Sequence, residues 1–269
     1  MENRIVIPDS FMGVNGEEAL ERIVKGRVGP QPLPESGKKS DFLGLPVNLN
    51  RADYIQVPQH NIIIAKAESL NGLDFYDTLE QLKSANLRAP KINQFVHHYM
   101  NVKRAAEGKK ALIDAGGNVL SQEDAEDLWN YLSSGHRGGC WTWLDALFEK
   151  NTASGEFYMK TDLRVVTNGN NKVLQGKPEE LDNYVKEDCY VGLEFTKEGL
   201  PINKSPIQKY EQVRNIRFYH PREGAVARFG ADSDRAFLVC VWDPSYRDSN
   251  LGVFACAEGT APKKSRGSK

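Results

Sequence analysis

Cys140 is the side chain in this sequence that is best suited to covalent chemistry. It lies in the run Gly138-Gly139-Cys140-Trp141, with small residues before it and an aromatic residue after it. A cysteine acts as a nucleophile when a histidine takes its proton and a polar group holds that histidine in place. Cys140 is therefore a candidate nucleophile, provided that a histidine follows at a suitable distance.

The spacing of the histidines argues against this chemistry. The run resembles the nucleophile segment of papain-type cysteine proteases, in which the catalytic histidine follows about 130 to 150 residues later. Counted from Cys140, that position falls near or beyond the last residue, whereas His220 is much too close. Ser134 also stands where that family has its oxyanion-hole glutamine. We interpret Cys140 as a buried thiol and keep a cysteine-nucleophile hydrolase as an alternative.

Metal-ligand patterns are weak throughout the chain. The four cysteines lie far apart with no CxxC pair, which is typical of free thiols in a core. His97 and His98 are adjacent, so on a helix they point about 100° apart and cannot bind one ion together. Oxygen ligands of the kind that calcium prefers occur, without an EF-hand pattern, at Asp232, Asp234, Asp243 and Asp248. We expect no metal and no cofactor, and keep a calcium-dependent carbohydrate-binding lectin as a second alternative.

Charge and hydropathy argue against two further classes of protein. The 35 Lys and Arg residues nearly balance 36 Asp and Glu residues, which gives a net charge of −1 and no basic field for nucleic acid. The apolar runs at 62–65 and 236–242 are far shorter than the ~20 residues of a membrane helix. No signal-peptide pattern follows Met1. We predict a monomer that binds neither nucleic acid nor the membrane interior; its compartment stays open, including surface display by another route.

The order of the expected elements indicates an α+β protein. Residues 1–50 are predicted to be a lead-in with a short helix at 16–24 and a Pro/Gly-rich loop at 27–46, and residues 259–269 a basic flexible tail. A hairpin is expected at 54–65, and amphipathic helices at 75–82, 93–106 and 122–134. Strands are expected mainly after residue 157, around a turn at 168–171 and at 190–195, 225–229, 236–242 and 251–256. Helices first and strands last favour α+β over alternating βαβ units.

The segment 229–251 differs in composition from the rest of the chain. It contains no Lys, Glu, Gln or Met. In a strand at 236–242, the side chains of Phe237, Val239 and Val241 share one face, and both faces are apolar. The loop that follows, 243–250, mixes Tyr, Ser, Asp, Asn and Arg, as antibody loops do. The segment is therefore either a buried strand with an ordinary loop or a binding surface.

Short motifs in and around this segment resemble a known family. Residues 227–229, 231–233, 235–236, 238, 240 and 243–244, with the closing run Ser249-Asn250-Leu251-Gly252-Val253-Phe254, resemble the variable region of diversity-generating retroelement target proteins, particularly the archaeal branch. In that family an error-prone reverse transcriptase rewrites template adenines, so that Asn codons become other codons ending in a pyrimidine. Every residue from 229 to 251 except Trp242 is reachable in this way.

The resemblance implies a non-enzymatic ligand-binding protein. It implies a C-type-lectin-like fold over residues 51–258, of the subtype related to formylglycine-generating enzymes, with helices packed against small antiparallel sheets and a variable region at about 227–256. Its ligands would be proteins or cell-surface targets, with Phe237 and Tyr246 as aromatic anchors and Arg247 at the rim. The diversified contact residues would be Asp232, Asp234, Phe237, Val239, Val241, Tyr246, Arg247, Asp248 and Asn250. The framework would be Arg235, Leu238, Cys240, Pro244, Leu251 and Gly252.

Overall fold

The computed structural model describes residues 10–11, 14–15, 49–169 and 171–259. The chain divides into two units, Met1–Glu35 and Ser36–Lys269. In the first unit, β1 (Ser10–Phe11) pairs antiparallel with β2 (Val14–Asn15). The helix expected at 16–24, the loop expected at 27–46 and nearly all of the expected tail, residues 260–269, lie outside the described residues.

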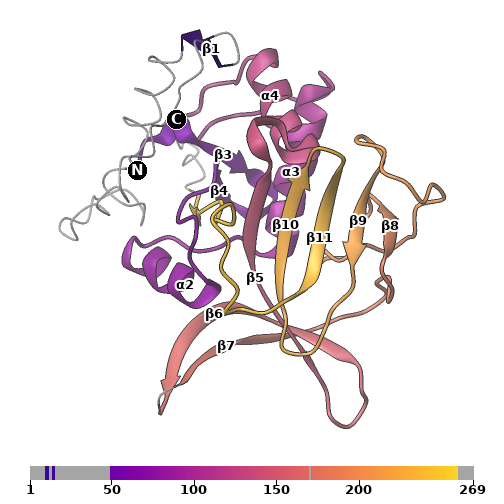
Figure 1. Ribbon diagram of the computed structural model, residues 1–269. Helices are drawn as coiled ribbons and strands as arrows, with labels where there is room; N and C mark the ends of the chain where they lie inside the picture. The colour runs from indigo at the N-terminus through magenta and orange to yellow at the C-terminus, as the bar shows by residue number, and fades with distance from the viewer. Residues whose placement is uncertain (1–9, 12–13, 16–48, 170, 260–269) are drawn as a thin grey trace, which may run out of the picture. The chain divides into compact units, whose positions relative to one another are not determined.

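A seven-stranded sheet forms the centre of the second unit (Figure 1). Its strands in spatial order are β7 (Asn171–Glu180), β6 (Phe157–Asn168), β5 (Cys140–Lys150), β10 (Val226–Asp232), β11 (Arg235–Trp242), β9 (Asn215–Tyr219) and β8 (Cys189–Gly192). Neighbouring strands are antiparallel except β11 and β9, which are parallel. The expected small antiparallel sheets are therefore wrong for this part of the molecule. The parallel pair arises because β10 and β11 form a hairpin that lies between β5 and β9.

A second, three-stranded sheet contains β12 (Cys256–Glu258), β4 (Ile62–Ala65) and β3 (Tyr54–Val57). The expected hairpin at 54–65 is confirmed: β3 pairs with β4 across a 3-10 turn, Pro58–His60. Two further 3-10 turns are Arg51–Asp53 and His136–Gly138. The expected strand at 251–256 is regular only at its end, because Gly252 and Val253 form isolated bridges to Thr142 and Ser69.

The three expected helices are confirmed as α2 (Phe75–Ser84), α3 (Ile92–Ala106) and α4 (Gln122–Ser134). The Ser121 side chain accepts a hydrogen bond from the Asp124 N–H at the start of α4, and Gly135 ends that helix in the left-handed conformation. None of the helices described is long and apolar enough to cross a membrane. Within the described residues of the second unit, three helices and two sheets are unevenly distributed along the chain, which makes this an α+β protein.

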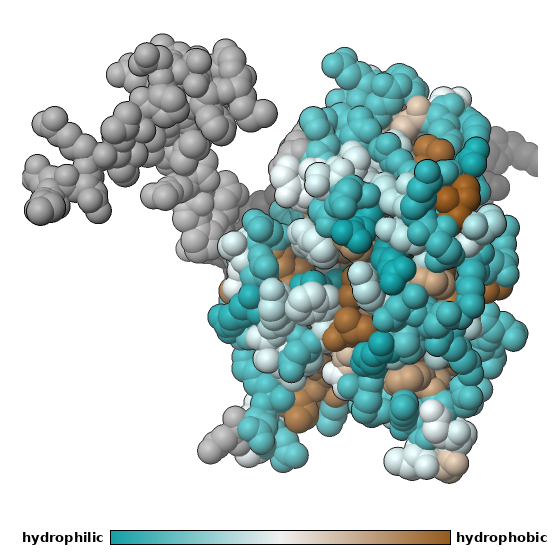
Figure 2. All heavy atoms as spheres, turned by 45° about the vertical axis from the view of Figure 1, so that its right-hand side comes forward, coloured by the Kyte–Doolittle hydropathy of each residue, from teal (hydrophilic) through white to brown (hydrophobic). Residues whose placement is uncertain are grey.

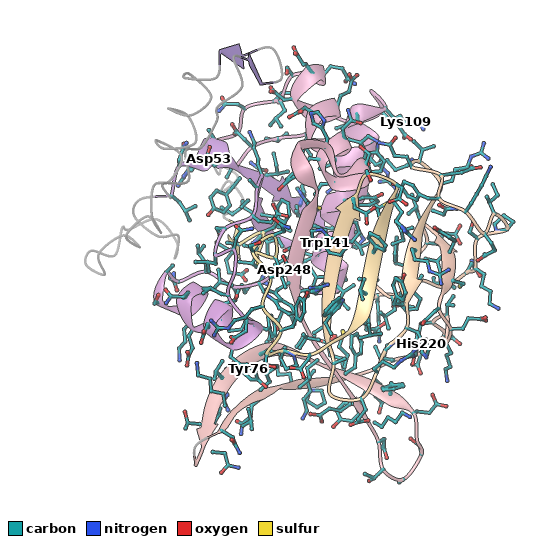
Figure 3. All side chains as sticks on the ribbon, viewed as in Figure 1. Asp53, Tyr76, Lys109, Trp141, His220 and Asp248 are labelled. Carbon is teal, nitrogen blue, oxygen red and sulfur yellow. The ribbon has the colours of Figure 1, made fainter. Side chains whose placement is uncertain are left out.

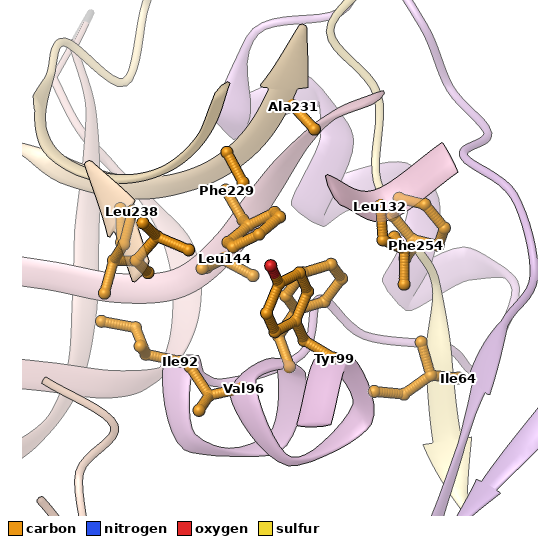
Figure 4. Packing of buried hydrophobic residues seen from close by; sticks show 14 of the residues in the cluster. Ile64, Ile92, Val96, Tyr99, Leu132, Leu144, Phe229, Ala231, Leu238 and Phe254 are labelled. Carbon is orange, nitrogen blue, oxygen red and sulfur yellow. The ribbon is translucent and has the colours of Figure 1, made fainter. Parts of the chain in front are cut away.

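The main core lies between the large sheet and helices α3 and α4 (Figures 1 and 4). Phe229 of β10 contacts the rings of Phe95 and Tyr99 of α3, with ring centroids 5.0 and 5.2 Å apart. Leu238 and Cys240 of β11 face the same core and are fully buried. The alternate residues of these strands must therefore lie on the opposite face of the sheet.

Helix α2 covers one part of that opposite face. Phe75 packs against Trp143 of β5 with ring centroids 5.3 Å apart, and Leu79 and Leu82 join the same cluster. In Figure 1 the part of this face formed by β10, β11, β9 and β8 has no helix over it. The side chains on this part of the sheet, together with the loop at 243–250, form the face that we consider below as a binding surface.

Candidate ligand-binding face

The register of four strands places two rows of side chains across this face. Because paired residues point to the same side of a sheet, Trp141, Gly230, Phe237 and Arg217 form one row, and Trp143, Arg228, Val239 and Tyr219 form the next. We call these residues the outer rows. The outer rows connect β5 with β9, β10 and β11, which come much later in the chain.

Gly230 allows the first row to lie flat. A Cβ atom at this position would be only 2.4 Å from the Trp141 ring, so the indole lies directly over the glycine backbone. The same ring stacks on Phe237, with centroids 5.4 Å apart and planes at 26°. Phe237 stacks in turn on Tyr219. The row is therefore held by aromatic packing that depends on a missing side chain in β10.

Arg228 lies among aromatic rings in the second row. Its guanidinium carbon is 3.6 Å from the centroid of the Trp242 ring and 5.4 to 5.6 Å from those of Trp141, Trp143 and Tyr246. The residue is only 3% exposed, and burial lowers the pKa of its guanidinium to about 10. Arg228 is thus a charged group at neutral pH, held by cation–π contacts.

The loop at 243–250 is anchored to the start of α2. The Phe75 N–H donates to the Pro244 carbonyl at 2.9 Å. Arg247 donates to Asp74 at 2.6 Å and to Asp77 at 2.5 Å. Two carboxylates from one helix end therefore hold an arginine that was expected to reach toward a ligand.

Carboxylates inside the segment 229–251 also shape their own turns. The Asp232 side chain accepts from the Arg235 N–H in the β10–β11 turn, and Asp248 accepts from the Asn250 N–H at 2.8 Å. The backbone of Asp232 lies against Gly135, where a Cβ would come within 2.4 Å of it. These contacts fix both ends of the face to helices α4 and α2.

The expected contact residues differ in how far they reach solvent. Phe237 and Val239 expose only 6% and 5% of their surface, because the strand that carries them is packed on both sides. This differs from an open apolar patch, and Figure 2 likewise shows hydrophobic surface in small separate areas among hydrophilic residues. The structure exposes Asp234, Arg247 and Asn250, leaves Asp232, Val241, Tyr246 and Asp248 half-buried, and buries Phe237 and Val239.

Arg228 and Gly230 belong to this face but were not among the expected contact or framework residues. Figure 3 shows Trp141 and Asp248 on the same side of the sheet, and both line a cavity with Arg228. Their positions in the chain lie more than a hundred residues apart. In the sequence, Arg228 and Gly230 alternate with apolar residues of a strand. This pattern does not identify the aromatic rings that surround them in the fold.

Cys140 lies in β5 and faces the main core, not the start of a helix. It has no exposed surface, and burial raises the pKa of its thiol well above the usual value, so the thiolate is disfavoured. His220 pairs instead with Asp188. All four cysteines are free and buried, as their spacing predicted.

We predict that thiol reagents modify the native protein slowly. In iodoacetamide at pH 7, Cys140, Cys240 and Cys256 should stay unmodified, and Cys189, at 6% exposure, should react first. Addition of denaturant should expose all four thiols. Intact mass and peptide mapping measure this directly, and fast native modification of Cys140 would instead support a reactive nucleophile.

The aspartates considered for calcium do not form one site. Among the residues that the structure describes, no group of three or more His, Cys, Asp or Glu side chains could hold a metal ion. Asp243 accepts from the Ser245 N–H at 2.7 Å, which commits one of its oxygens to a turn. His97 is exposed and His98 is fully buried, so the adjacent pair points in different directions, as expected.

Comparison with known proteins does not assign a function to this chain. No protein-family model, no curated protein and no solved structure matches the chain. The function proposed below therefore depends on the residues of this face and on the sequence resemblance.

Proposed function

We propose that this protein is a non-enzymatic, receptor-like binding protein whose C-terminal segment is diversified by a retroelement. Its ligands would be proteins or cell-surface targets, held by the outer rows and the loop at 243–250. The proposal includes a C-type-lectin-like fold for residues 51–258. The sequence motifs support this subtype, and the α+β architecture supports only the broader class to which it belongs.

One observation carries the proposal: the strand residues of segment 229–251 point alternately into the core and onto the candidate face, and positions at the two ends of that face reach solvent. Phe229, Leu238 and Cys240 are buried against the helices, whereas Asp234, Val241 and Asn250 reach solvent on or beside the other face. A surface that tolerates many side chains needs a backbone fixed by other residues. Here the Gly135 contact with Asp232 and the Phe75–Pro244 hydrogen bond fix it from outside the segment.

Comparison of many copies of the gene tests this proposal. We expect substitutions at codons 232, 234, 241, 246, 247, 248 and 250, with Arg228, Gly230 and Leu238 unchanged. We also expect a nearby, nearly identical repeat, with adenines at the varying positions, next to a reverse transcriptase gene. The absence of both the repeat and the reverse transcriptase would overturn the proposal.

Two substitutions in β11 test whether the scaffold is independent of its variable face. Val241→Ala, at a half-buried outer position, should lower the free energy of unfolding by less than about 1 kcal/mol. Leu238→Ala, at a fully buried core position of the same strand, should lower it by about 2–5 kcal/mol. Urea denaturation measures both values. Equal losses would show that the two faces of β11 contribute alike to the fold.

A further inference from the structure

A cavity of about 270 Å³ opens on the candidate face beside Arg228. It is lined by Trp141, Arg228, Trp242, Tyr246, Asp248, Asn250 and Leu251. Framework and expected variable residues therefore meet in one hollow, and its walls combine aromatic rings with a single cation and a single carboxylate.

The cation in this cavity lacks the partners that buried arginines usually have. Arg228 is 97% buried, given its exposure of 3%, and its Nε atom has no hydrogen-bond partner. Within the described ranges, no carboxylate lies within 4.0 Å of its guanidinium: the ion pairs of the neighbouring arginines, Arg235 and Arg247, use Asp234, Asp74 and Asp77. A buried, charged donor without an acceptor is costly, and an arriving anion would satisfy it.

The geometry around Arg228 favours a carboxylate as that anion. The guanidinium carbon lies 3.6 Å from the centroid of the Trp242 ring and is surrounded by three further rings, so packing restricts the guanidinium before a ligand arrives. A fixed planar guanidinium matches the two oxygens of a carboxylate through paired hydrogen bonds. Asp248 lines the same cavity, which limits the negative charge that the ligand can carry and favours a singly charged group with a hydrogen-bond donor nearby.

We infer that this cavity binds one carboxylate group of a protein ligand, with Arg228 as its receptor and the surrounding rings as its walls. The inference rests on the proposed function, because it supplies ligand chemistry for the same face. The carboxylate could belong to an acidic side chain or to a chain end. Both present the same two oxygens, so the experiment uses a probe for each source.

The test is a titration of the intact, ¹⁵N-labelled protein followed at the Arg228 Nε–H signal. N-acetyl-glutamate methylamide represents an acidic side chain, and N-acetyl-alanine represents a chain end. Their uncharged counterparts, N-acetyl-glutamine methylamide and N-acetyl-alanine amide, are the matched controls. We expect a saturable shift with at least one carboxylate and none with the amides; the stronger carboxylate identifies the source.

Two aspartate variants make the test independent of Arg228 itself. Asp248→Asn removes the carboxylate in the cavity and should tighten binding of the carboxylate probe roughly fivefold. Asp243→Asn removes a carboxylate of the same loop that does not line the cavity, and should change binding less than about twofold. Arg228→Lys keeps the charge but loses the planar pair of donors, and should weaken binding at least about tenfold.

Three results would overturn the inference: no saturable shift with either carboxylate, equal shifts with the amides, or weaker binding by Asp248→Asn. Such a failure is distinguishable from failure of the proposed function. If codons 232–250 vary among copies of the gene, and Leu238→Ala destabilises the protein more than Val241→Ala does, the proposed function stands and only the carboxylate site is lost. Conversely, if the protein binds a carboxylate but the gene does not vary, the carboxylate site stands and the proposal of retroelement diversification is rejected.

Discussion

Gly230→Ala is expected to lower the free energy of unfolding by about 2–3 kcal/mol, although it adds a single methyl group. The added Cβ would lie 2.4 Å from the Trp141 ring, a distance that van der Waals contact does not allow. The indole would have to leave the strand surface, and with it would go its stacking on Phe237 and its contact with Arg228. Urea denaturation gives the loss of stability, and tryptophan fluorescence reports the displaced ring.

Gly192→Ala is the matched control for this prediction. Gly192 also lies in a strand of the large sheet, but a Cβ there would meet no atom within 4 Å. We expect its free energy of unfolding to change by less than about 0.5 kcal/mol. In a Trp141→Ala background, Gly230→Ala should cost much less than in the parent protein, because the clash is gone. An unchanged cost would show that the Trp141 ring is not what the methyl group disturbs.

The local elements of this fold were largely predictable because their signals are local. The α4 helix begins at the Ser121 cap and ends at Gly135, as the sequence indicated, and the hairpin at 54–65 forms around its Pro58 interruption. In each case a capping or turn residue lies next to the periodic segment that it delimits. Such signals require no knowledge of distant parts of the chain.

The arrangement of the sheet was not predictable in the same way. The parallel pairing of β9 with β11 joins residues about 20 positions apart, and the insertion of β10 beside β5 joins residues about 80 to 90 positions apart. Hydropathy periodicity does not encode either pairing. For the same reason the alternation of β11 predicted two apolar faces but not which neighbours bury Phe237. Trp141 and Tyr219, which stack on Phe237, come from β5 and β9.

The candidate site shows this limit most clearly at two arginines. The family resemblance implied that Arg247 is a contact residue, but its partners Asp74 and Asp77 lie at the start of α2, about 170 residues earlier. Arg228 was a motif residue without an assigned role, because its aromatic neighbours come from three separate segments. Charge and residue type suggest that an arginine binds something; only the fold decides whether the partner is internal.

Acidification should destabilise this protein through His98. The side chain is fully buried in α3, and neither ring nitrogen has a hydrogen-bond partner within the described residues. Burial alone lowers its pKa from 6.5 to about 4. As the pH falls below 6.5, the unfolded chain therefore gains a proton that the folded chain does not take up, and the folded state loses relative stability until the pH reaches about 4.

The difference in unfolding free energy between the parent protein and His98→Leu isolates this effect. Compared with pH 7, the parent protein should lose about 2 kcal/mol of unfolding free energy relative to His98→Leu at pH 5, and about 3 kcal/mol at pH 4. Other groups cancel in the difference, including Asp145, whose buried carboxyl has a pKa raised to about 6 and contributes the opposite slope. If the difference is the same at pH 7, pH 5 and pH 4, the His98 side chain reaches solvent in the folded protein.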